Sequence, residues 1–160
     1  MFLLSSNKFS FIFFLSLIFF LIQSNLPSIA IYNYNKINLD LILVFLTALV
    51  FFKDSYKIIF LAFFYGFIQD IIVNVNQFGV LSFLKSFAAF LLLYIRKYDT
   101  IWDKKIKFLY VFLIYFLHFY LYYFSIYNNN YFSIFFISFM QSIVTFILFL
   151  LVNKFFIKVK

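Results

Sequence analysis

Long runs of hydrophobic residues, separated by short polar segments, make up most of the chain. A helix that crosses a bilayer needs about 20 predominantly apolar residues, within a range of about 17–25. The pattern predicts six such helices, at residues 9–31, 37–52, 58–73, 78–95, 108–127 and 131–152. The first run is longer than the apolar core of a signal peptide and lacks a good cleavage site, so we expect a retained helix that bends near Pro27. The expected fold is one all-α transmembrane domain covering residues 1–160.

The basic residues predict the orientation of these helices. Cytoplasmic connections of membrane proteins carry an excess of Lys and Arg. If both termini lie on one side, that side collects eleven of the 13 basic residues, whereas Lys36 lies on the other side and Lys85 within a helix. We therefore expect both termini in the cytoplasm, with a basic loop from 96 to 107 that faces cytoplasmic partners or anionic lipid. The eleven are Lys8, Lys53, Lys57, Arg96, Lys97, Lys104, Lys105, Lys107, Lys154, Lys158 and Lys160.

The composition excludes other classes of protein. The chain is 67% hydrophobic and 11% charged, whereas a soluble domain is about 45–50% apolar and about 25% charged. Too few polar residues remain to cover a surface in water. The wealth of Phe, Ile, Asn, Lys and Tyr indicates an AT-rich bacterial genome, so we assign no function to the Phe content. The net charge of +8 serves orientation rather than nucleic-acid binding, and with no Cys and one His, no metal or cofactor site is expected.

Small and polar residues gather on one face of the third and of the fourth predicted helix, at spacings of three and four. The short connection at 74–77 makes these helices antiparallel neighbours. Asp70 and Lys85 then fall at similar depth, and we hypothesise an ion pair between them, direct or through water. In the alternative, Lys85 extends its ammonium to the membrane surface and Asp70 caps a helix end. The two faces comprise Ala62, Gly66, Gln69, Asp70 and Val73, and Gly79, Ser82, Lys85, Ser86 and Ala89.

Polar residues also align on the fifth and sixth predicted helices, where we expect hydrogen bonds between helices. Nothing in the sequence offers His118 a partner acid or a nucleophile, and no hydrolase, metalloprotease or phosphate-binding motif is present. No catalytic residue and no enzymatic activity are expected, which disfavours a membrane enzyme acting on lipid-linked substrates. The aligned residues are Tyr115, His118, Tyr122 and Ser125, and Ser138, Gln141, Ser142 and Thr145.

The segment 60–93, FLAFFYGFIQDIIVNVNQFGVLSFLKSFAAFLLL, resembles the rod shape-determining protein MreD family. Members of that family carry Gly-x-x-x-Asp, a short polar turn, and then Phe/Leu-Gly at the start of the next helix. The sequence departs from the family in having less Gly and Leu around the motif and Lys85 where a neutral residue is common. Outside this segment the resemblance is one of hydropathy and length. The matching residues are Gly66, Phe67, Gln69, Asp70, Phe78 and Gly79.

This resemblance implies a non-enzymatic inner-membrane subunit of the cell-elongation machinery. Such a subunit would bind a bitopic MreC-like protein, alongside the actin-like MreB and the peptidoglycan synthases of the lateral wall. The family's helical arrangement is similar to that of the substrate-binding component of energy-coupling-factor vitamin transporters. The alternative function is therefore the substrate-binding component of a vitamin or metal transporter, with a ligand pocket near Asp70, Asn74, Asn76 and Gln77.

Overall fold

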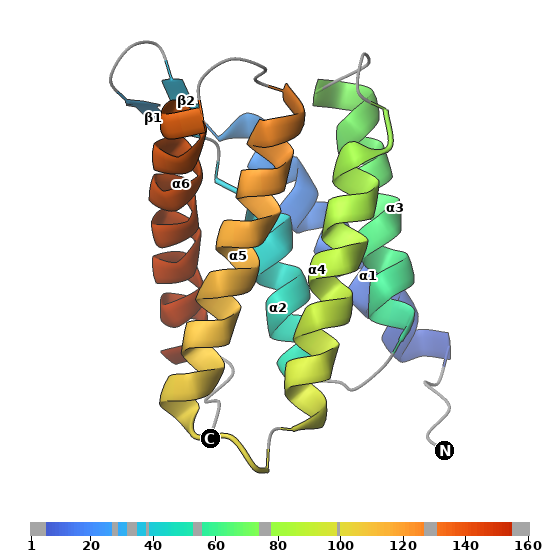
Figure 1. Ribbon diagram of the computed structural model, residues 1–160. Helices are drawn as coiled ribbons and strands as arrows, with labels where there is room; N and C mark the ends of the chain where they lie inside the picture. Colours follow the sequence, from blue (N-terminus) through green and yellow to red (C-terminus); the bar gives the residue numbers. More distant parts are fainter. Residues whose placement is uncertain are drawn as a thin grey trace.

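The protein is a bundle of six α-helices with one short β-hairpin (Figure 1). The computed structural model describes residues 6–26, 29–31, 35–37, 39–52, 56–73, 78–98, 100–126 and 131–154. Within these residues, the all-helical expectation is confirmed. The elements are α1 (Ser6–Asn25), β1 (Ile29–Ile31), β2 (Asn35–Ile37), α2 (Leu41–Phe52), α3 (Lys57–Val73), α4 (Val80–Lys97), α5 (Lys104–Ile126) and α6 (Tyr131–Val152).

Successive helices run in alternating directions. The start of α1, the connection between α4 and α5, and the end of α6 lie at one end of the bundle, while the β-hairpin and the tops of α3 to α6 lie at the other (Figure 1). The pairs α3–α4 and α5–α6 pack most extensively, and α4 joins them by packing against α5. The short helix α2 lies in the middle and contacts α1, α3, α4 and α6.

The first predicted helix, 9–31, ends six residues too late. The structure ends α1 at Asn25, and Ile29–Ile31 forms β1, which pairs antiparallel with β2 so that Ile29 lies opposite Ile37. Pro27 explains the break, because proline has no backbone N–H to donate and disfavours helical geometry in the residue before it. The expected continuous helix with a bend near Pro27 is therefore wrong, because α1 ends at Asn25, before Pro27, which lies outside the described residues.

The second predicted helix begins late. It was expected over 37–52, but α2 has only 12 residues and starts at Leu41, while Ile37 belongs to β2. At 1.5 Å per residue, α2 is about 18 Å long, well short of the roughly 30 Å of a bilayer's hydrocarbon core. Every residue from 42 to 51 is buried. Such a helix, apolar on all sides, suits the centre of a bundle.

The remaining four helices agree with the prediction to within four residues at each end. The largest difference concerns the basic loop. Arg96 and Lys97 form the last turn of α4, and the three lysines that follow lie in the first turn of α5. Lys104 and Lys105 are exposed, whereas Lys107 is buried. The basic residues expected in a loop therefore lie at the end of α4 and the start of α5, which residues 98–103 connect. The expectation that Lys107 lies on the surface is wrong.

Apolar side chains lie both in the core and on the outer surface, and polar side chains lie in the interior among the apolar ones. Large apolar side chains cover the outside, where Phe132 is 80%, Phe60 69% and Phe83 65% exposed. Helices α5 and α6 are each long and apolar enough to cross a membrane, yet only 33% and 39% of their most apolar stretches are buried. The interior also holds the polar side chains of Asp40, Thr47, Gln69, Asp70, Ser82, Lys85, His118, Ser138, Gln141, Ser142 and Thr145.

Candidate functional site

Asp70, near the end of α3, caps the start of α4. Its side chain is fully buried and accepts four hydrogen bonds. The donors are the backbone N–H groups of Gly79, Leu81 and Ser82 at 3.2, 3.0 and 3.0 Å, and the Ser82 hydroxyl at 2.7 Å. The first turn of any helix has N–H groups without a partner in the helix, and a carboxylate there also complements the helix dipole. The alternative that Asp70 caps a helix end is therefore confirmed, and the end belongs to the next helix.

The two glycines of the chain permit this arrangement in different ways. Gly79 is the N-cap residue of α4 and has a φ of 97°, in the left-handed region that side chains disfavour. Gly66 lies against the backbone of α4, where an added Cβ would come within 2.5 Å of the Ser82 Cα. Only glycine allows α3 and α4 to approach so closely. The residues of the family resemblance thus lock one helical hairpin, while Phe67 and Phe78 stack edge to face on its outside.

Lys85 forms its ion pair with Asp40, not with Asp70. Its Nζ donates to Asp40 Oδ2, and both side chains are buried. The hypothesis of a direct Asp70–Lys85 pair is wrong because the Asp70 oxygens are occupied by the start of α4. The alternative, a lysine that extends to the surface, is also wrong, since Lys85 is 0% exposed.

Asp40 also begins the central helix. Its Oδ1 accepts the Leu43 N–H at 2.9 Å, an N-cap bond, and Gln23 from α1 accepts the Ile42 N–H at 2.9 Å. These two bonds satisfy backbone groups that would otherwise be buried without partners. In Figure 1 the chain before α2 descends into the bundle, so this helix starts inside it. The capping bonds make an irregular, buried entry to α2 possible.

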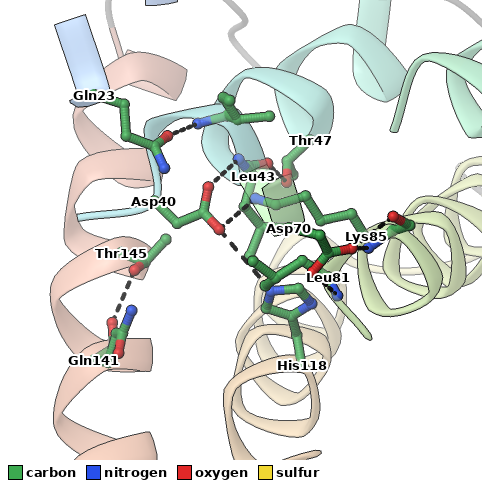
Figure 2. Close-up of polar contacts among 12 residues, drawn as sticks. Gln23, Asp40, Leu43, Thr47, Asp70, Leu81, Lys85, His118, Gln141 and Thr145 are labelled. Atoms are coloured by element: carbon green, nitrogen blue, oxygen red, sulfur yellow. Dashed lines mark hydrogen bonds and ion pairs between the residues drawn. The ribbon is translucent and has the colours of Figure 1, made fainter. Parts of the chain in front are cut away.

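His118 from α5 completes a cluster around the Asp40 carboxylate. Figure 2 shows this carboxylate between the start of α2, Lys85 and His118. The His118 Nε2 lies 3.9 Å from Asp40 Oδ2, and the ring is 3% exposed. The Leu84 backbone adds a weaker polar contact that falls outside hydrogen-bond geometry. The sequence offers His118 no partner acid, whereas the fold brings the Asp40 carboxylate to 3.9 Å from its ring, across 78 residues of chain.

One cavity reaches this cluster, and a second cavity adjoins the first. The inner one, of about 80 Å³, is lined by the cluster residues Asp40 and His118 together with Gln23, Leu39, Gln69, Leu81, Phe119, Tyr122, Tyr123 and Gln141. The outer cavity, of about 210 Å³, lies between α1, α3 and Leu39, which precedes Asp40. It shares Gln23, Leu39 and Gln69 with the inner cavity. Asp70 lines neither cavity, and the expected pocket residues Asn74, Asn76 and Gln77 lie outside the described residues.

The polar residues of α5 and α6 make bonds both between helices and within their own helix. Of the expected α5 residues, Tyr115 donates to Thr47 of α2 at 2.7 Å, whereas Ser125 donates to the Tyr122 carbonyl of its own helix. Tyr123, which was not predicted, donates to the predicted Gln141 of α6. The hydroxyls on α6 also donate to carbonyls of their own helix, one turn back, which is how Ser and Thr satisfy themselves in an apolar helix. These bonds are Ser138 to Ile134, Ser142 to Phe139 and Thr145 to Gln141.

The sequence-based prediction missed Asp40, Gln23 and Thr47. One signal could have revealed Asp40, because an acidic residue directly before an uninterrupted apolar run is typical of a helix N-cap. Nothing in the sequence connects Asp40 to Lys85, which lies 45 residues away. Among the described residues, no group of three or more His, Asp or Glu side chains is placed to hold a metal ion.

The fold and site define a class of protein: a bundle of apolar helices around a buried, charge-paired polar centre. In comparisons with known proteins, no family model, no curated sequence and no solved structure matches this chain.

Proposed function

We propose that the chain is a multi-pass protein of a bacterial inner membrane, with six spans and both termini in the cytoplasm. The exposed apolar surface carries this proposal, because a coat of exposed Phe around a core with buried Asp, Lys and Gln suits an apolar solvent. Two helices meet the length and hydropathy of a span, and the alternating helices bring the basic helix ends to one end of the bundle. The central helix α2 need not reach both surfaces, since other helices surround it.

This topology predicts opposite labelling of two single-cysteine variants. The chain has no native Cys, so an introduced thiol is the sole target. Tyr131→Cys, at the exposed start of α6, should react in intact cells with a maleimide that cannot cross membranes. Thr100→Cys, in the exposed connection between α4 and α5, should react only after the cells are permeabilised. Labelling of Thr100→Cys in intact cells would contradict the proposed orientation.

Within that membrane, we propose a non-enzymatic subunit of the cell-elongation complex, as the MreD resemblance implies. The supporting observation is that Gly66, Asp70 and Gly79 all serve to fix α3 against α4. A motif devoted to rigid packing suits a scaffold whose outer face holds the single transmembrane helix of a partner. The basic ends of α4 and α5 would then face cytoplasmic partners or anionic lipid head groups.

Co-purification tests the scaffold function. The chain is expressed with the MreC-like bitopic protein of the same genome, solubilised in mild detergent, and purified through a tag on the partner. We expect a complex of fixed stoichiometry, and rounded cells when the chain is depleted from its host. An unrelated single-span protein with the same tag serves as the control. Equal recovery with both baits, or rod-shaped cells after complete depletion, would refute this function.

The cavities favour a second function, that of a transporter's substrate-binding component. They lie where α1, α3 and the entry to α2 meet, close to the polar cluster, as a ligand site in a helical bundle would. This function predicts stable association with ATP-hydrolysing subunits and uptake of a small solute that stops when the chain is removed. Co-purification with such subunits in place of the bitopic partner would favour it over the scaffold.

A further inference from the structure

The unsatisfied polar atoms of the interior converge on one cavity. In the part of the chain that the structure describes, three buried side-chain nitrogen or oxygen atoms have no hydrogen-bond partner: Gln69 Oε1 and both ring nitrogens of His118. Gln69 is 8% and His118 3% exposed, and both residues line the inner cavity, from α3 and α5 respectively. A buried polar atom without a partner is costly, and its presence in a folded protein calls for an occupant that supplies one.

The chemistry of these atoms defines what the occupant must offer. The Gln69 oxygen is an acceptor and needs a donor. A neutral imidazole presents one nitrogen acceptor and one N–H donor, and the N–H of His118 needs an acceptor. An occupant must therefore both donate and accept hydrogen bonds.

The charges around the cavity balance before any occupant enters. Asp40 and Lys85 neutralise each other, and Asp70 is occupied by the start of α4. A charged occupant would find no free counter-ion in this low-dielectric interior, where an unpaired charge is far more costly than an unpaired dipole. The occupant is therefore uncharged.

The volumes set its size. An engineered apolar cavity of about 150 Å³ takes up benzene, and the outer cavity here, at about 210 Å³, exceeds that. The inner cavity, at about 80 Å³, admits only a small group. A molecule of a few heavy atoms, or one such group on a molecule held in the outer cavity, fits this pair of spaces.

We propose that the inner cavity binds a small uncharged group that carries paired donor and acceptor atoms, of the amide type. Its N–H donates to Gln69 Oε1, and its carbonyl accepts from the His118 ring, next to the Asp40–Lys85 pair. The site is independent of the scaffold function, and in a transporter it would be the part that selects substrate.

The single histidine provides a direct test. His118 is the only His and Trp102 the only Trp in the chain, so ¹⁵N labelling of these two residue types gives one resonance set for each. Full-length protein with a histidine-free tag, in lipid nanodiscs at fixed pH, is titrated with acetamide and urea. Acetate and methylammonium of similar size serve as charged controls. We expect acetamide and urea to shift the His118 ring resonances in a saturable way, and to leave Trp102, at the other end of the bundle, unchanged.

Each outcome decides the proposal. The variant Gln69→Met keeps the length of the side chain but removes the acceptor, and should weaken the acetamide response roughly 3- to 10-fold, the size of one neutral hydrogen bond. If neither uncharged probe gives a saturable shift in the wild-type protein, the cavity holds ordered water only and the proposal is overturned. A parallel shift of Trp102 would also overturn it, as a general solvent effect. Tighter binding of acetate or methylammonium would refute the charge argument. None of these results bears on co-purification with a bitopic partner.

Discussion

Replacing Lys85 with methionine should lower the free energy of unfolding by about 3–5 kcal/mol, because it leaves the buried Asp40 carboxylate without a counter-charge. Asp40→Asn should be damaging for the same reason, since it strands the ammonium of Lys85. Asparagine remains a good N-cap, so this change removes the charge but preserves the bond to the start of α2. Thermal unfolding in detergent, followed by circular dichroism and by the fluorescence of the single Trp102, measures both effects.

The double variant is the decisive measurement. With both charges removed, no unpaired charge stays in the interior, so Asp40→Asn/Lys85→Met should lie within about 1 kcal/mol of the wild-type protein. Lys105→Met makes the same chemical change at an exposed position and should have little effect. A double variant as unstable as the worse single variant would show that the two residues do not act as a pair.

Replacing Asp70 with alanine should separate α4 from α3 and lower the free energy of unfolding by about 3 kcal/mol or more. The change leaves three backbone N–H groups and the Ser82 hydroxyl without an acceptor in a buried place, and hydrogen bonds to a charged group are each worth about 1.5–3 kcal/mol. Asp70→Asn should cost less, because one amide oxygen can still accept. Thermal unfolding in the same detergent ranks the variants.

Asp103 provides the matched control for this prediction. It precedes α5 much as Gly79 precedes α4, but it is exposed, and its side chain makes no hydrogen bond to the described residues around it. Asp103→Ala should therefore change stability by less than about 1 kcal/mol. If Asp70→Ala were equally mild, the cap across the hairpin would contribute little to the fold.

The helices of the bundle were predictable because their signals are local. Apolar length and helical periodicity depend only on neighbouring residues, so α6 was predicted at its observed bounds, and α3, α4 and α5 nearly so. The predicted helix bounds are wrong where a single residue ends or delays a helix within an apolar run. Pro27 stops α1, and Asp40 delays α2 by offering its side chain to the Leu43 N–H. Hydropathy alone treats both residues as minor interruptions.

The candidate site was predictable in part. The resemblance to a family motif identified Gly66, Asp70 and Gly79, and helical spacing put Asp70 on the face that meets α4. Helical spacing does not show that backbone N–H groups of α4 donate hydrogen bonds to the Asp70 carboxylate. The sequence places Lys85 correctly in the interior. It favours Asp70 as the partner because Asp70 is close in the chain, whereas the structure pairs Lys85 with Asp40.

The sequence by itself determined that this chain is helical, that its helices are strongly apolar, and that Gly66, Asp70 and Gly79 fall on one helical hairpin. Those properties follow from composition and from spacings within a few residues. Only the tertiary structure decided that α2 starts inside the bundle, which brings Asp40 to Lys85 and His118 and leaves a cavity beside them. The physical reason is that pairing of buried charges depends on the depth at which each helix begins, and that depth is set by packing among all six helices rather than by the residues near any one of them.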